Sequence, residues 1–109
     1  MPRPSLLKLG LITCIATDDF TGTDKLVGVL GADRFSIGEF EAGSSFDVGI
    51  ERPIAPGVTE LTILEADVIE DDVLATIDLT QDMDVDRVFG ILTGDARYDV
   101  NFLVISEPN

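Results

Sequence analysis

An alternation of apolar and polar residues near the C-terminus restricts the possible folds of this chain more than any other feature. In residues 97–104, RYDVNFLV, every second position is apolar: Tyr98, Val100, Phe102 and Val104. Successive side chains of a strand point to opposite faces, whereas an amphipathic helix would need a period near 3.6. Residues 46–51 repeat the alternation, with Phe46, Val48 and Ile50 on one side. Both stretches are therefore predicted to be strands that bury one face.

Turn-forming segments divide the rest of the chain into short apolar runs. GADR, EAGS, APG and TGD separate stretches rich in Val, Ile and Phe, as in proteins built from short strands. We predict eight strands, at residues 6–16, 25–30, 34–40, 45–51, 58–65, 73–79, 87–92 and 96–106. This pattern indicates an all-β chain folded as an eight-stranded antiparallel β-sandwich with Greek-key connections. The length of 109 residues suits one domain spanning residues 1–109.

The charge balance limits the classes of partner. The chain has 21 acidic and 7 basic residues, which give a net charge of −14. Neutralising nucleic-acid phosphates requires clustered Lys and Arg, so nucleic acid is not an expected partner. Cations and basic protein surfaces are the complementary partners.

The residue inventory also argues against an enzyme. The chain has no histidine, which removes Ser-His-Asp and Cys-His catalysis, and it has no Trp and one Tyr to line a sugar-binding cleft. The single cysteine, Cys14, cannot form an internal disulfide, and its mid-strand position favours a small core or surface residue over a nucleophile. Because the first residues show no signal-peptide cleavage pattern, we expect a cytoplasmic protein, with export without a cleaved signal left open.

Two acidic loops are predicted to meet at one end of the sandwich. Successive strands of an antiparallel sandwich run in opposite directions, so the loops at residues 17–24, 41–44, 66–72 and 93–95 should share an end. The segments TDDFTGTD (17–24) and EADVIEDD (65–72) together carry eight acidic residues. Hard cations such as Ca²⁺ take six to eight oxygen ligands, which flexible carboxylate-rich loops supply. The sequence therefore indicates a metal site at this end.

A solvated loop would explain the same residues without an ion. Charge runs in acidic proteins are commonly hydrated, and acidic edges suppress aggregation. In this alternative the chain is a structural or assembly subunit that packs against copies of itself or a larger complex. Its acidic loops then only keep it soluble.

The two loops resemble those of the C2 domain family, the calcium-and-lipid-binding β-sandwiches. In that family an Asp-containing loop ending in a further Asp meets a later loop with an Asp-x-Asp pair, another Asp and a Gly. DDFTGTD is similar to the first loop and LTILEADVIEDDVLATIDL contains the second, with Glu65 for the first Asp and Ala75 for the Gly. The resemblance implies Ca²⁺ as the bound ion. The implied metal ligands are Asp18, Asp19, Asp24, Glu65, Asp67 and Asp72, with Asp71 as a peripheral candidate.

Apolar residues at the tips of the same loops are candidates for partner contact. Phe20 lies in the first loop, and Val68 and Ile69 lie in the second. They either fold back onto the core or enter an apolar surface once Ca²⁺ screens the carboxylates. That surface is a protein groove or neutral lipid, and protein is favoured because an anionic membrane would repel the acidic chain. A homo-oligomer is also compatible with the sequence.

A third acidic stretch, DMDVD at residues 82–86, begins like an EF-hand loop. Arg87 stands where that loop needs Gly, and Thr93 stands where it needs a bidentate Glu. We predict a solvated loop at the opposite end of the sandwich.

Overall fold

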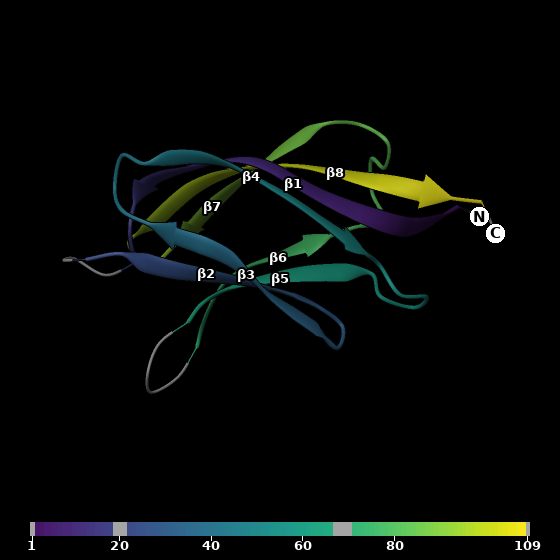
Figure 1. Cartoon of the computed structure of the whole chain (residues 1–109), viewed down its shortest axis with the longest axis horizontal. Helices are drawn as coiled ribbons and strands as arrows, with labels where there is room; N and C mark the ends of the chain where they lie inside the picture. The colour runs from purple at the N-terminus through teal and green to yellow at the C-terminus, as the bar shows by residue number, and fades with distance from the viewer. Residues whose placement is uncertain (1, 19–21, 67–70, 109) are drawn as a thin grey trace.

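The computed structural model describes residues 2–18, 22–66 and 71–108, which form two stacked four-stranded antiparallel sheets (Figure 1). One sheet has the strand order β4-β1-β8-β7 and the other β3-β2-β5-β6. The predicted eight-stranded sandwich is confirmed, although the first strand begins three residues earlier than predicted. The strands are β1 (Arg3–Ala16), β2 (Asp24–Leu30), β3 (Asp33–Phe40), β4 (Ser45–Pro53), β5 (Glu60–Glu65), β6 (Asp72–Asp78), β7 (Arg87–Thr93) and β8 (Ala96–Glu107).

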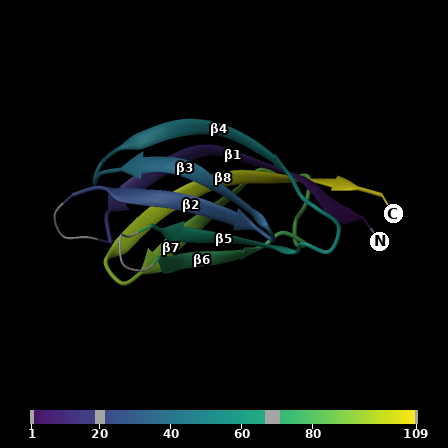
Figure 2. The ribbon, with the colours of Figure 1, turned by 60° about the horizontal axis from the view of Figure 1, so that its bottom comes forward.

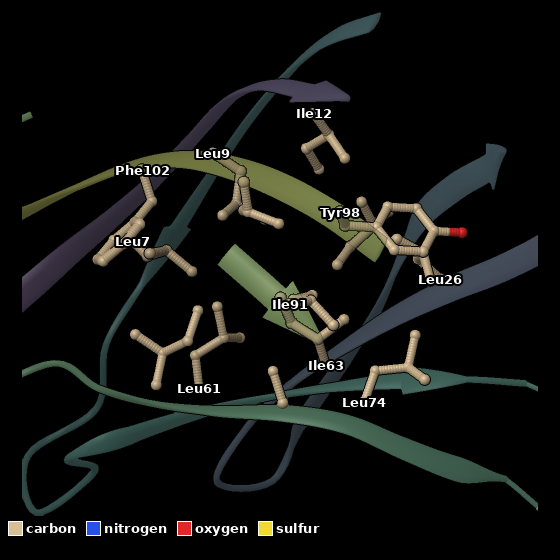
Figure 3. Packing of buried hydrophobic residues seen from close by; sticks show 14 of the residues in the cluster. Leu7, Leu9, Ile12, Leu26, Leu61, Ile63, Leu74, Ile91, Tyr98 and Phe102 are labelled. Carbon is tan, nitrogen blue, oxygen red and sulfur yellow. The ribbon is translucent and has the colours of Figure 1, made fainter. Parts of the chain in front are cut away.

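The core fills the space between the two sheets. On β8 the predicted apolar face is buried in full, and Figure 3 shows Tyr98 and Phe102 of this strand among aliphatic residues from both sheets. Removing such side chains from water is the main favourable contribution to folding, at about 1.5–3 kcal/mol for each large apolar side chain. Cys14 is part of this core.

The strand β4 is less buried because it lies at the edge of its sheet. Val48 and Ile50 pack against the core, while Phe46 remains 51% exposed with its ring centroid 5.7 Å from that of Phe40. Gly49 has φ of 57°, and the pairing of β1 with β4 shifts register beside it. The predicted apolar face is thus present, and only its burial is incomplete.

Alternate loops lie at the same end, as predicted. Figure 2 shows the β3–β4 connection and the β7–β8 turn at the end opposite the two termini. The Cys14 amide donates to the Ser44 carbonyl at 2.8 Å, which holds the β3–β4 connection beside the end of β1. At the other end the Leu79 amide donates to the Thr59 carbonyl at 2.9 Å. None of the described residues forms a helix that is long and apolar enough to cross a membrane.

Candidate metal centre

The register of β5 and β6 places two acidic side chains directly opposite each other. Glu65, the last residue of β5, pairs with Asp72, the first residue of β6. The Ala66 amide donates to the Lys25 carbonyl at 2.8 Å, which holds this end of β5 against β2. Like charges directly opposite each other in an antiparallel pair are destabilising. A cation between the two carboxylates would relieve this repulsion.

A third carboxylate comes from the loop that follows β1, a strand of the other sheet. Asp18 follows the end of β1 by two residues, and its carboxylate oxygen lies within 4.8 Å of one from Glu65 and one from Asp72, which are likewise within 4.8 Å of each other. Two ligands of one Ca²⁺ are at most about 5 Å apart, because each Ca–O distance is 2.3–2.6 Å. Among the described residues this is the one group of three or more potential metal ligands. Its spacing and oxygen-only chemistry fit a hard cation.

The three carboxylates differ in their access to solvent. Glu65 is only 7% exposed, Asp18 is half-buried and Asp72 is exposed. Together they form a centre that is closed toward the protein at Glu65 and open toward solvent at Asp72.

The turn between β7 and β8 lies beside Asp18. Gly94 has φ of 59°, and a Cβ added to it would be 3.3 Å from the Asp18 carboxylate. A side chain at this position would be strained and would crowd the carboxylate. Sequence motifs did not identify Gly94 as part of the site. The available signal was its loop, residues 93–95, which was predicted to lie at the same end as the acidic loops.

Asp24 is fully buried next to Asp18. Its Oδ2 accepts a hydrogen bond from the Asp18 amide at 2.9 Å and another from the Tyr98 hydroxyl at 2.5 Å. Its Oδ1 is buried and has no hydrogen-bond donor among the described residues. A buried polar atom without a partner costs about 1–3 kcal/mol, so a cation or donor reaching this oxygen would stabilise the fold. Asp24 does not belong to the group formed by Asp18, Glu65 and Asp72.

Tyr98 is the polar residue that the sequence motifs missed. Burial and the hydrogen bond to Asp24 raise the pKa of its hydroxyl far above the ordinary value. A buried tyrosine needs a partner for its hydroxyl, and in Figure 3 the Tyr98 oxygen points away from the aliphatic cluster. Its inward position just after the 93–95 turn was the available signal that it would lie near the acidic loops.

The Cys14 thiol belongs to the same buried polar cluster. Cys14 pairs with Tyr98 across β1 and β8. Burial raises the pKa of the thiol, the hydrogen bond with Tyr98 lowers it, and the nearby Asp24 carboxylate raises it again, with a net increase. The thiol is therefore held in its protonated, weakly nucleophilic form.

The remaining predicted site residues divide into two groups. Asp71 forms an ion pair with Arg34, with Nη2 and Oδ2 2.9 Å apart. The others lie outside the described residues, and their predicted roles as ligands or contact residues stay predictions: Asp19, Phe20, Asp67, Val68 and Ile69.

The DMDVD stretch is held against the end of β8. Asp84 has φ of 66°, and its carboxylate accepts hydrogen bonds from the Ser106 amide at 2.9 Å and from the Ser106 hydroxyl. These bonds, the hydroxyl first, lower the pKa of Asp84. The carboxylates at 82, 84 and 86 do not form a potential metal group in the described structure.

Comparison with known proteins identifies the fold. No protein-family model matches this chain, and no curated protein matches it in sequence. A solved structure of the two C2 domains of extended synaptotagmin 2 matches 95% of the chain with a TM-score of 0.57. The chain has a C2-like fold. With 18% identity the similarity establishes the C2-like fold alone, and the chain covers 42% of that longer structure.

Proposed function

We propose that this C2-like chain is a Ca²⁺-binding module that docks a protein or lipid partner when the ion orders its acidic loops. The observation that carries the proposal is the convergence of Asp18, Glu65 and Asp72 within 4.8 Å. The buried Asp24 oxygen without a donor and the C2-like fold support it. In this proposal the chain is a binding module and not an enzyme.

Four described acidic residues take part in the proposed site. Asp18, Glu65 and Asp72 hold the ion. Asp24 fixes the Asp18 backbone through the 2.9 Å hydrogen bond and offers its buried Oδ1, which has no donor among the described residues, as a further ligand. Asp19 and Asp67 are proposed as further ligands. A bound Ca²⁺ supplies two positive charges, which offset the repulsion between Glu65 and Asp72 and make the local potential less negative.

Phe20, Val68 and Ile69 are proposed to contact the partner once these charges are offset. Burial of each in an apolar surface would contribute about 1.5–3 kcal/mol. A protein groove is the favoured surface, because the net charge of −14 opposes approach to an anionic membrane. The second candidate surface is a neutral lipid bilayer.

Calorimetric titration with CaCl₂, together with thermal unfolding in Ca²⁺ and in chelator, tests ion binding. A ligand that binds only the folded state at a hundredfold excess over Kd raises the free energy of unfolding by about 2.7 kcal/mol. For a chain of this size, Tm should rise by roughly 10 °C. The Asp72→Asn variant should lose most of this shift. In chelator it should be at least as stable as the wild type, because it relieves the repulsion of Glu65.

Glu60→Gln is the matched control. Glu60 lies on β5 like Glu65 and pairs with an acid on β6, Asp78, but at the opposite end of the two strands. The control removes one negative charge and should keep the full Ca²⁺ shift. If Ca²⁺ gives no heat and no shift in Tm, the chain does not bind the ion and the solubilising role of the loops is the better explanation.

Sedimentation with zwitterionic vesicles in Ca²⁺ tests the partner class. If the wild type pellets with the vesicles and the double variant Phe20→Ala, Ile69→Ala does not, the partner is a neutral lipid surface and the preference for protein is wrong. If the wild type binds Ca²⁺ but does not pellet, a protein groove remains the proposed partner surface.

A further inference from the structure

The strand β7 has one free edge. It pairs only with β8, and the register from Arg87 to Thr93 runs without a bulge. In the described part of the chain no other backbone hydrogen bond involves β7. The Thr93 hydroxyl donates to the Leu74 carbonyl at 2.6 Å, so only the loop end of β7 is tied to β6. Residues 88–92 therefore present unpaired backbone groups along a regular strand.

The other three edge strands each carry features that oppose pairing with another chain. The strand β4 has Gly49 at φ of 57° and a register shift against β1. The strand β3 has Gly38 at φ of 152° and a register shift against β2. The strand β6 has a register shift against β5 between Val73 and Ala75. Bulges and charged residues are the usual protection of sheet edges, and β7 has neither between residues 88 and 92.

The apolar side chains of β7 are unusually exposed. Leu92 at 71% and Val88 at 65% are the two most exposed large apolar residues of the described chain. They lie on the outer face of the sheet, whereas Phe89 and Ile91 of the same strand pack against the core. An edge of this kind is a template for strand addition.

We propose that β7 is a homodimerisation edge, at which β7 of a second copy adds antiparallel about a two-fold axis through Gly90. In that register Val88 lies opposite Leu92 of the second copy, and Leu92 lies opposite its Val88. The dimer thus contains two symmetry-related Val88–Leu92 pairs, in which the two most exposed apolar side chains shield each other from solvent. A two-fold contact must be self-complementary, and the sequence VFGIL of residues 88–92 meets this condition.

Gly90 lies at the centre of the proposed contact. Its backbone is not in the left-handed region, and a Cβ added to it would meet only the Asp99 carboxylate, at 3.8 Å. The fold of a single copy therefore does not require glycine here. A glycine within a strand often marks the close approach of another backbone.

The centre of the contact carries no negative charge. On the outer face of β8 the nearest acidic residue is Asp99, which pairs with Gly90. At each end of the contact Asp86 would lie opposite Gly94 of the second copy and next to its Asp95, with Arg87 beside it to offset part of that charge. Two Asp99 residues related by the two-fold axis would be three strand spacings apart, or about 14 Å. This exceeds the Debye length of about 8 Å at physiological ionic strength. Added salt should strengthen the dimer by screening the remaining repulsion.

Sedimentation equilibrium of the full chain in chelator tests the proposal without any dependence on Ca²⁺ binding. The wild type should show a monomer–dimer equilibrium. Val88→Lys and Leu92→Glu should each weaken the dimer about tenfold or more, because each removes two cross-strand apolar pairs per dimer. The double variant Val88→Lys, Leu92→Glu should recover much of the loss, because each Lys then faces a Glu of the second copy. Within one copy these positions are four residues apart along a strand and do not pair.

Two control variants separate edge pairing from other contacts. Val88→Glu with Leu92→Glu places like charges opposite each other and should stay monomeric. Leu11→Lys changes an exposed apolar residue on β1, in the interior of the same sheet, and should leave the dimer unchanged. A wild type that stays monomeric up to millimolar concentration, a dimer lost in Leu11→Lys, or a failure of the Lys–Glu double variant to recover association would overturn the proposal. Assemblies larger than a dimer would also contradict it, because each copy has one free β7 edge and the two-fold contact occupies the free edge of both copies.

Discussion

The side chain of Tyr98 connects the core to the acidic end of the sandwich. Its ring packs edge-on against Phe40, with centroids 6.0 Å apart, while its hydroxyl donates to the fully buried Asp24. The same Asp24 oxygen accepts a hydrogen bond from the Asp18 amide. The position of Asp18 in the candidate centre thus depends on a carboxylate and a hydroxyl that are themselves hidden from solvent.

Tyrosinate absorbance should report this environment directly, because Tyr98 is the one tyrosine in the chain and there is no tryptophan. Burial and the Asp24 hydrogen bond raise the pKa of Tyr98, so the folded protein should show no ionisation near pH 10. The chain unfolded in guanidinium should titrate near the ordinary value of about 10. Because only the unfolded chain releases this proton, the free energy of unfolding should fall as pH rises above about 10. A folded protein that forms tyrosinate reversibly near pH 10 would contradict the buried hydrogen bond.

Two strand glycines should respond in opposite ways to the same substitution. Gly28 of β2 pairs with Phe35 of β3, and a Cβ added to Gly28 would be 2.4 Å from the Phe35 ring. The Phe35 ring is buried, and Arg52 lies over it with its guanidinium carbon 4.8 Å from the centroid, so the ring has little room to move away. Gly90 of β7 has open space instead.

We predict that Gly28→Ala lowers the free energy of unfolding by about 1–3 kcal/mol, as overpacking does in a filled site. Gly90→Ala should be neutral or stabilising by up to about 1 kcal/mol, because alanine loses less backbone entropy on folding. Urea unfolding of both variants at low protein concentration measures the difference. Equal effects would show that the Phe35 ring can move away from β2.

At the scale of the whole molecule, repulsion between acidic residues opposes folding. The net charge of −14 is carried by a domain with a radius of gyration of 13.7 Å, and acidic pairs such as Glu65 and Asp72 lie well within the Debye length of about 10 Å at 0.1 M salt. The ion pairs between described residues are partly or largely exposed, as for Arg3 with Glu107 and Lys8 with Glu51. Exposed pairs of this kind stabilise a protein weakly, so the repulsion dominates.

Tm in chelator should therefore rise when NaCl is increased from low salt to about 0.5 M, because salt screens more repulsion than attraction. Asp72→Asn should show a smaller rise than the wild type, since one repulsive contact is already removed. Calorimetric scans at each salt concentration measure the effect. A fall in Tm with salt would mean that the exposed ion pairs outweigh the excess of acidic residues.

The strand pattern could be predicted because it depends on local chemistry. A strand that buries one face must alternate, so Tyr98, Val100, Phe102 and Val104 could be assigned to the core in advance. Gly and Pro mark turns through backbone geometry that a few neighbouring residues determine. Loop parity follows from antiparallel strand direction, which is why the two acidic segments were correctly placed at one end.

Which carboxylates converge depended on contacts between residues far apart in the chain. Asp18 and Asp24 are both acids of one short segment, yet Asp24 turns inward to Tyr98 while Asp18 reaches Glu65 and Asp72 on the other sheet. The register of β5 against β6 and the hydrogen bond from Tyr98 of β8 to Asp24 decide this arrangement, and neither can be recognised from a local sequence pattern. The free edge of β7 likewise appears only when the strand order is known, because an edge strand and a central strand can carry the same alternation.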